Sequence, residues 1–207
     1  MVFPCLTIVM ILIALLTYKI RVSDRKMRNS TKEFWEKEQR ANNTRRQSLD
    51  SLSYIEIPIE QFPMEADPDE TITACQQRIR RLADEKIVNL SGITNTDLKL
   101  AYGAPNLDLL ASYDQNCTEL LRTLFQWGEA LFNAGQYDAA KTVLEFGVSC
   151  KTDISKHYTL LAEIYKKENT PHKIQELIHS AEELTSMRRN AIIGSLNKIF
   201  ESCHAPG

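Results

Sequence analysis

The stretch LFQWGEALFNAGQYDAAKTVLEFG, residues 124–147, decides the fold that we expect for this chain. Apolar and small residues recur in it at spacings of three and four, which is the pattern of an amphipathic helix. Gly135 interrupts the pattern, and a glycine just after the last periodic residue commonly ends a helix. The stretch therefore predicts two helices joined by a short turn.

The same spacing returns 34 residues further along the chain. Gly128 then corresponds to Ala162, and Gly147 corresponds to Ala181. Small residues at these positions let neighbouring helices approach closely, while aromatic and aliphatic residues fill the remaining space. A fixed period of this length is the signature of stacked helical hairpins, and we expect such an array here.

The pattern resembles the tetratricopeptide repeat over roughly residues 121–186. The first unit is similar throughout, whereas the second departs from the family at Pro171 and Ile174. The layout, with the run NLSGITNTDLKLAYG at residues 89–103, also looks like that of uncharacterised membrane-anchored tetratricopeptide proteins of bacteria. The alternative is a generic helical bundle with a chance echo at 34 residues. The matched positions are Leu124, Trp127, Gly128, Leu131, Gly135, Tyr137, Ala140, Leu144 and Gly147, then Tyr158, Leu161, Ala162, Tyr165, Asn169, Pro171, Ile174, Ile178 and Ala181.

Start and stop signals predict an all-α domain over residues 68–204. The run Asp67-Pro68-Asp69-Glu70 offers a capping side chain, a proline at the first helical position and acids in the first turn. Asp153 and Thr170 are expected to cap two later helices. The helices before and after the two repeat units complete an array that would otherwise be too short. The predicted helices are 68–90, 95–102, 105–134, 137–150, 153–168, 171–184 and 186–202.

The N-terminal run from Val2 to Tyr18 carries no charge. Its 17 residues span about 26 Å as a helix, against roughly 30 Å for the hydrocarbon core of a bilayer, and Ile20 and Val22 extend the run. We expect residues 1–22 to be a retained transmembrane anchor. The alternative is a cleaved signal peptide, but neither a basic region before the run nor a small-x-small site after it is found.

The charge is divided unevenly along the chain. Residues 19–47 hold ten Lys or Arg and four Asp or Glu, a net of +6, whereas residues 48–207 hold 15 and 23, a net of −8. Basic residues directly after an apolar span place that side in the cytoplasm, so we expect a single-pass protein with its N-terminus outside and its C-terminal domain cytoplasmic. An acidic folded part disfavours nucleic-acid binding. Residues 23–41 are expected to continue the helix as a basic juxtamembrane segment.

Residues 42–67 are expected to be a linker that contains one extended segment. Isoleucines at positions 55, 57 and 59 alternate with Glu56, Pro58 and Glu60, which is the period of a strand with one apolar face. The prolines keep it from being a central strand. We expect it to pack on the helical domain, and one alternative is docking beside Lys166 and Lys167.

The resemblance implies a concave partner-binding surface formed by alternate positions of the first helix in each unit. This surface offers two phenylalanines beside a row of lysines, which suits an extended or helical peptide with apolar anchors and acidic character. The alternative is that these residues are covered or merely exposed. The candidate residues are Arg122, Phe125, Glu129, Phe132, Asn133, Lys156, Thr159, Glu163, Lys166 and Lys167.

The sequence shows no catalytic motif: it contains no phosphate loop, no GxSxG and no HExxH. Its four histidines are scattered, and Cys203-His204 lacks partners for a zinc site. We therefore expect no enzyme, cofactor or metal, but an interaction scaffold for an unknown protein or peptide at the membrane. Two alternatives stay open, a structural subunit of a membrane complex held through its anchor and an enzyme with an unrecognised site.

Overall fold

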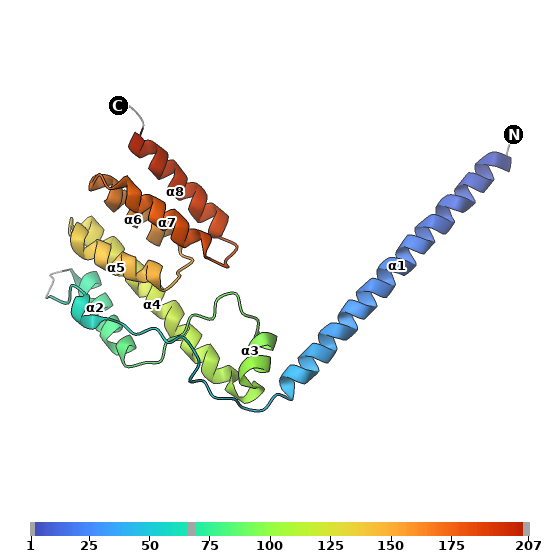
Figure 1. Cartoon of the computed structure of the whole chain (residues 1–207), viewed down its shortest axis with the longest axis horizontal. Coiled ribbons are helices and arrows are strands. Elements are labelled where there is room, and N and C mark those ends of the chain that lie inside the picture. The colour runs from blue at the N-terminus through green and yellow to red at the C-terminus, as the bar shows by residue number, and fades with distance from the viewer. Residues whose placement is uncertain (1–2, 66–68, 205–207) are drawn as a thin grey trace. The chain divides into compact units, whose positions relative to one another are not determined.

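The computed structural model describes the backbone of residues 3–65 and 69–204, with the side chains of residues 3–7, 26 and 204 left out (Figure 1). It divides into two compact units, the first formed by residues up to 48 with 94–107, and the second by residues 49–93 and 108 onward. Helices dominate the described residues, and the one β feature among them is an isolated bridge between Tyr54 and Val88. The predicted all-α class is confirmed. The elements are α1 Phe3–Asn42, the 3-10 turn η1 Ile59–Gln61, α2 Glu70–Ala83, α3 Asn95–Tyr102, the 3-10 turn η2 Ala104–Asn106, α4 Leu107–Asn133, α5 Tyr137–Ser149, α6 Ser155–Lys167, α7 Pro171–Glu182 and α8 Arg189–His204.

Helix α1 runs without a break through the apolar run and the basic segment, as the sequence predicts. Its apolar side chains from Ile8 to Val22 are exposed. Among the residues with described side chains, no helix contains a stretch long and apolar enough to cross a membrane. The predicted anchor is residues 1–22, and the side chains of its first seven residues lie outside that description.

The first unit is held together by polar contacts between the end of α1 and α3. Lys37 pairs with Asp97 at 2.7 Å, and Lys99 donates to Glu38 at 2.5 Å and to Asn42 at 2.7 Å. The hydrogen bond from Lys99 is the main cause that lowers the pKa of Glu38. The sequence placed residues 94–107 in the helical domain, whereas the structure groups them with α1.

The turn after α3 depends on one glycine and one buried amide. Gly103 has a φ of +89°, and a Cβ there would lie 2.2 Å from the carbonyl oxygen of Arg45. The Asn106 amide donates to the carbonyls of Gln47 and Tyr102, both at 2.8 Å. These contacts fix the backbone that follows α1 against α3.

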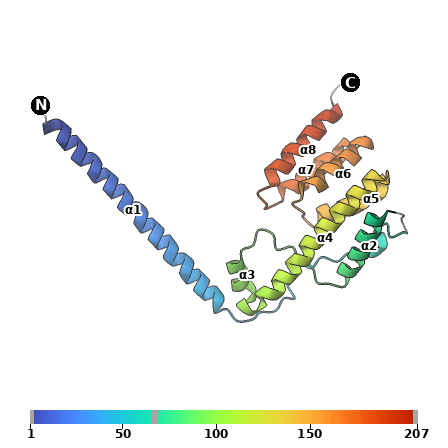
Figure 2. The same cartoon turned by 180° about the vertical axis from the view of Figure 1, so that it is seen from behind.

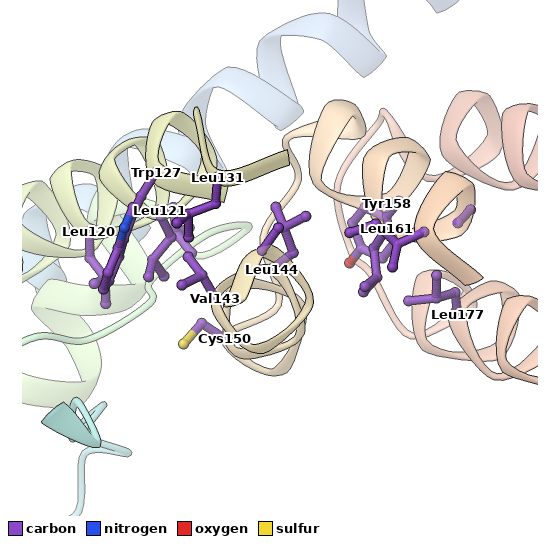
Figure 3. Packing of buried hydrophobic residues seen from close by; sticks show 14 of the residues in the cluster. Leu120, Leu121, Trp127, Leu131, Val143, Leu144, Cys150, Tyr158, Leu161 and Leu177 are labelled. Carbon is purple, nitrogen blue, oxygen red and sulfur yellow. The ribbon is translucent and has the colours of Figure 1, made fainter. Parts of the chain in front are cut away.

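In the second unit, α5 to α8 pack as successive neighbours, which the two opposite views show (Figures 1 and 2). Figure 3 shows Leu144 of α5 lying between Leu131 of α4 and Leu161 of α6. The close approach expected at the small residues is present. A Cβ on Gly128 would lie 2.6 Å from the Leu144 side chain, and one on Gly147 would lie 2.3 Å from the ring of His157.

Residues 54–65, which we call the strap, cover part of this core. The strap isoleucines are partly buried against the core cluster, as predicted, and Phe62 is fully part of it. The ring of Phe62 meets those of Trp127 and Phe146 edge-on, at 5.5 and 5.3 Å. The buried amide of Gln76 donates to the carbonyls of Pro63 and Glu65, both at 2.9 Å. Thus α2 holds the end of the strap.

Several predicted helix ends differ from the structure. Helix α2 ends at Ala83 rather than near residue 90, because the backbone beyond it has other partners: Ile55 donates to the Ile87 carbonyl and Val88 donates to the Tyr113 carbonyl. The cap of α2 is Asp69, whose carboxylate accepts from the amides of the first turn, whereas Asp67 and Pro68 lie outside the described residues.

Of two further capping predictions, one is wrong and one is confirmed in position only. Asp153 does not cap α6, which follows Ile154 instead, and the Asp153 carboxylate accepts a hydrogen bond from Ser186. Thr170 is the N-cap residue of α7 and Pro171 is its first residue, as predicted, but the Thr170 hydroxyl donates to the Tyr165 carbonyl and accepts no capping hydrogen bond. The last helix begins at Arg189, three residues later than predicted, because the Ser186 hydroxyl forms a local turn with the Arg188 amide.

Candidate partner-binding surface

The ten candidate residues lie on α4 and α6, two helices of the second unit. Five come from α4 or its end and five from α6. Arg122, Asn133, Lys156, Lys166 and Lys167 are exposed, and the other five are half-buried. The surface is therefore accessible in the structure, and its aromatic side chains are partly covered by neighbouring groups.

The first cluster is formed by Phe125, Lys156 and His157. The Phe125 and His157 rings lie 5.7 Å apart with a tilt of 35°, and the Lys156 ammonium lies 5.6 Å from the Phe125 ring. This geometry is a cation–π contact at an exposed site, where such a contact contributes about 0.5–1 kcal/mol. Phe125 thus has a buried imidazole on one side and an exposed cation above it.

His157 is the buried support of this cluster. Its Nε2 lies 3.0 Å from the Leu121 carbonyl oxygen, so Nε2 carries the proton, and Nδ1 has no hydrogen-bond partner among the described residues. Burial lowers the pKa of His157 to about 4. The ring is therefore neutral near pH 7 and serves packing rather than proton transfer.

The second cluster is formed by Phe132, Tyr137 and Lys167. The Lys167 ammonium lies 5.1 Å from the Phe132 ring and 4.4 Å from the Tyr137 ring, and it donates to the Tyr137 hydroxyl at 2.9 Å. The two rings meet edge-on at 5.3 Å. The repeat pattern predicts a packing position for Tyr137. In the structure Tyr137 is exposed, because it begins α5 directly after the loop that follows α4.

The two clusters follow the same order along α4 and α6. Phe125 meets Lys156 early in α6, and Phe132 meets Lys167 at its end. The two helices therefore run in the same direction on this face, with an aromatic ring from α4 beside a lysine from α6 at each end. Lys166 is not part of either contact, since its ammonium donates to the Ser202 hydroxyl of α8 at 2.8 Å.

A hollow of about 550 Å³ adjoins the first cluster. Three predicted residues line it, Arg122, Phe125 and Glu129, together with Asp153 and Arg188 from loops later in the chain. The last two were not among the candidates, because a repeat pattern gives no information about the loops between units. The hollow extends the surface with charged groups of both signs.

The strap leaves this surface open. Phe62 packs on Trp127, and Trp127 lies two residues from Phe125, on roughly the opposite side of α4. Apart from local turns, the hydrogen bonds of the strap backbone to other described residues go to Ile87 and Gln76, which belong to neither cluster. Docking of the strap beside Lys166 and Lys167 is therefore not what the structure shows.

Chemistry at other side chains is limited in the described part of the chain. No group of three or more His, Cys, Asp or Glu there could hold a metal ion. Cys117 and Cys150 are buried, which raises their pKa values to about 12 and about 11, so both stay protonated thiols near pH 7. Searches of protein-family models, curated proteins and solved structures find no match to this chain.

Proposed function

We propose that this protein is a membrane-anchored interaction scaffold whose tetratricopeptide-like helices bind a protein or peptide partner at the cytoplasmic face. The observation that carries the proposal is the pair of accessible aromatic–lysine clusters on α4 and α6. Phe125 and Phe132 are only half-buried within the protein, so part of each ring remains exposed beside Lys156 or Lys167.

A partner with apolar side chains and nearby carboxylates fits this surface. Its apolar groups would cover the partly exposed rings of Phe125 and Phe132. The exclusion of water from these rings would strengthen the contacts between its carboxylates and Lys156 or Lys167. An extended or helical peptide can reach both clusters, since they lie along one pair of helices. We infer an acidic peptide or an acidic helix face as the ligand.

We also propose that residues 1–22 anchor the protein in a membrane. The uncharged run from Val2 to Tyr18 and the exposed apolar side chains of α1 support it, and the basic residues that follow support a cytoplasmic second unit. The net +6 of residues 19–47 favours anionic lipid headgroups, whereas the net −8 beyond residue 48 is repelled by them.

The surface is tested by affinity capture with the full-length protein in detergent. A partner retained by the unmodified protein should be lost with Phe132→Ala/Lys167→Ala and kept with Lys198→Ala, which removes an exposed lysine of α8. Equal retention by all three would show that the clusters are not the binding surface.

The anchor is tested by alkaline carbonate extraction of membranes. The full-length chain should stay in the membrane pellet, and a chain that lacks residues 1–22 should be released. Release of the full-length chain would contradict the anchor and leave the surface proposal to its own test.

A further inference from the structure

Helix α1 carries a line of exposed apolar side chains that continues past its apolar run. Ile13, Ile20, Met27 and Phe34 are each seven residues apart, and each is more than half exposed. Seven residues are close to two helical turns, so the four side chains lie along one face. The line extends about 32 Å along the helix, from the 1.5 Å rise per residue.

The positions between these four are also uncharged. Three residues after each of the first three come Leu16, Ser23 and Ser30. Every charged residue between Ile13 and Phe34 falls at another position of the seven-residue repeat. These charged residues are Lys19, Arg21, Asp24, Arg25, Lys26, Arg28, Lys32 and Glu33. The result is an uncharged seam with the spacing of positions a and d of a coiled coil.

The seam ends where the first unit covers the helix itself. Ala41, seven residues after Phe34, is fully buried, and α3 packs on this end of α1. The same line of positions is thus covered at residue 41 and open from residue 13 to residue 34.

We propose that the seam pairs with the α1 of a second copy of this chain, as a parallel two-stranded coiled coil. Charge complementarity between Lys19 and Asp24 supports this occupant. Lys19 occupies position g and Asp24 occupies position e of the next repeat, which face each other across the two chains of a parallel pair. Lys26 faces the uncharged Thr31 in the same relation, and Glu33 faces Glu38, whose charge is already paired with Lys99 of its own chain. In an antiparallel pair, position g faces g and position e faces e, so Lys19 and Asp24 would not face each other.

A second copy of α1 can bury the whole seam, whereas lipid can cover only the part within the apolar run. Met27 and Phe34 lie about 10 and 21 Å beyond Ile20 along the helix, within the charged segment. The isoleucines at position a favour two strands, and the serines at position d make the pairing weak. A weak pairing of this kind depends on the two chains being held in one membrane. It does not depend on the partner-binding surface.

Disulfide crosslinking of the full-length protein in membranes tests the proposal. Cys5 and Cys203 are first replaced by serine, since the other three cysteines are buried. Under mild oxidation Met27→Cys should give homodimer at least about fivefold faster than Lys32→Cys, which lies on the opposite face of the helix. Equal rates at the two positions, or no homodimer from either, would overturn the proposal. Both substitutions are on an exposed helix surface, so folding is not at issue.

A charge exchange tests the register. In the Met27→Cys background, Asp24→Lys should lower the crosslinking rate because it places lysine opposite lysine, and Lys19→Asp/Asp24→Lys should restore it. Failure of the double substitution to restore the rate, or a disulfide at Met27→Cys to a different protein only, would exclude the parallel self-pairing.

Discussion

The two tryptophans lie in regions that are held together in different ways. Trp35 is on the exposed side of α1 in the first unit, whose α1–α3 contact rests on lysine–carboxylate pairs. Trp127 is completely buried in the second unit, where its ring meets Phe62 of the strap. A unit held by ion pairs responds to salt and pH, and a unit held by apolar packing responds to lost volume. The comparison therefore predicts which substitutions matter and which do not.

Trp127→Ala should have the largest effect of the substitutions considered. The side chain is fully buried and contacts Phe62, so its removal leaves a cavity and frees the strap. Loss of a buried tryptophan costs about 3–5 kcal/mol of unfolding free energy. Trp35→Ala is the matched control and should change stability by less than about 0.5 kcal/mol. Chemical denaturation monitored by circular dichroism measures both, and similar losses would contradict the packing described.

Acidification should weaken the second unit through His157. Its pKa is about 4 in the folded protein against 6.5 for an unperturbed histidine, so the unfolded chain binds the proton first. The stabilisation is complete above pH 6.5 and is lost as the pH falls toward 4, by about 3 kcal/mol at most. His157→Gln should flatten this pH dependence, measured as denaturation midpoints between pH 7 and pH 4. If the denaturation midpoint of the variant depends on pH as steeply as that of the unmodified protein, groups other than His157 cause the loss of stability.

Gln76→Leu should loosen the strap with a smaller loss of stability. The buried amide holds two strap carbonyls, and leaving them without a donor costs about 1–3 kcal/mol. Hydrogen exchange should rise at the amides of residues 54–65 and stay unchanged in α7. The exposed neighbour Gln77→Leu is the control, and equal exchange in both variants would show that Gln76 is not the clamp.

The first unit should show the smallest and the most salt-dependent effect. Lys99→Ala removes the partner that lowers the pKa of Glu38. In the unmodified protein the contact stabilises the unit above the ordinary titration range of a carboxyl group, and this stabilisation is lost as the pH falls through the lowered pKa of Glu38. Hydrogen exchange in α3 should increase with Lys99→Ala and with 1 M salt, but not with Lys32→Ala. Insensitivity to both changes would mean that apolar contacts at Ala41 and Leu98 hold the unit.

Periodicity and capping predicted much of the fold, because they report local geometry. The helices from residue 105 to residue 184 follow from their apolar spacing, and Gly128 and Gly147 lie at close helix contacts as expected. The packing of Ile55, Ile57 and Ile59 on the core also followed from their alternation with Glu56, Pro58 and Glu60. Helix ends that depend on distant partners were missed, such as the end of α2, where residues 87 and 88 bond to Ile55 and Tyr113.

The surface could be predicted only in part for the same reason. Repeat spacing placed Phe125 and Phe132 on one face of α4, but it could not show which lysine meets which ring. The repeat pattern gave Tyr137 a packing position, whereas the structure places it beside Lys167 at the surface, and Arg188 reaches the hollow from a loop for which the repeat has no rule. Their contribution depends on how helices meet in space.

The scaffold proposal is tested most directly by photocrosslinking in intact membranes. A photoreactive amino acid is placed in the full-length protein at position 125, 132 or 175, the last being the exposed Gln175 of α7. We expect the same crosslinked partner from positions 125 and 132 and none from position 175. A partner that crosslinks equally from all three positions, or only from position 175, would contradict it.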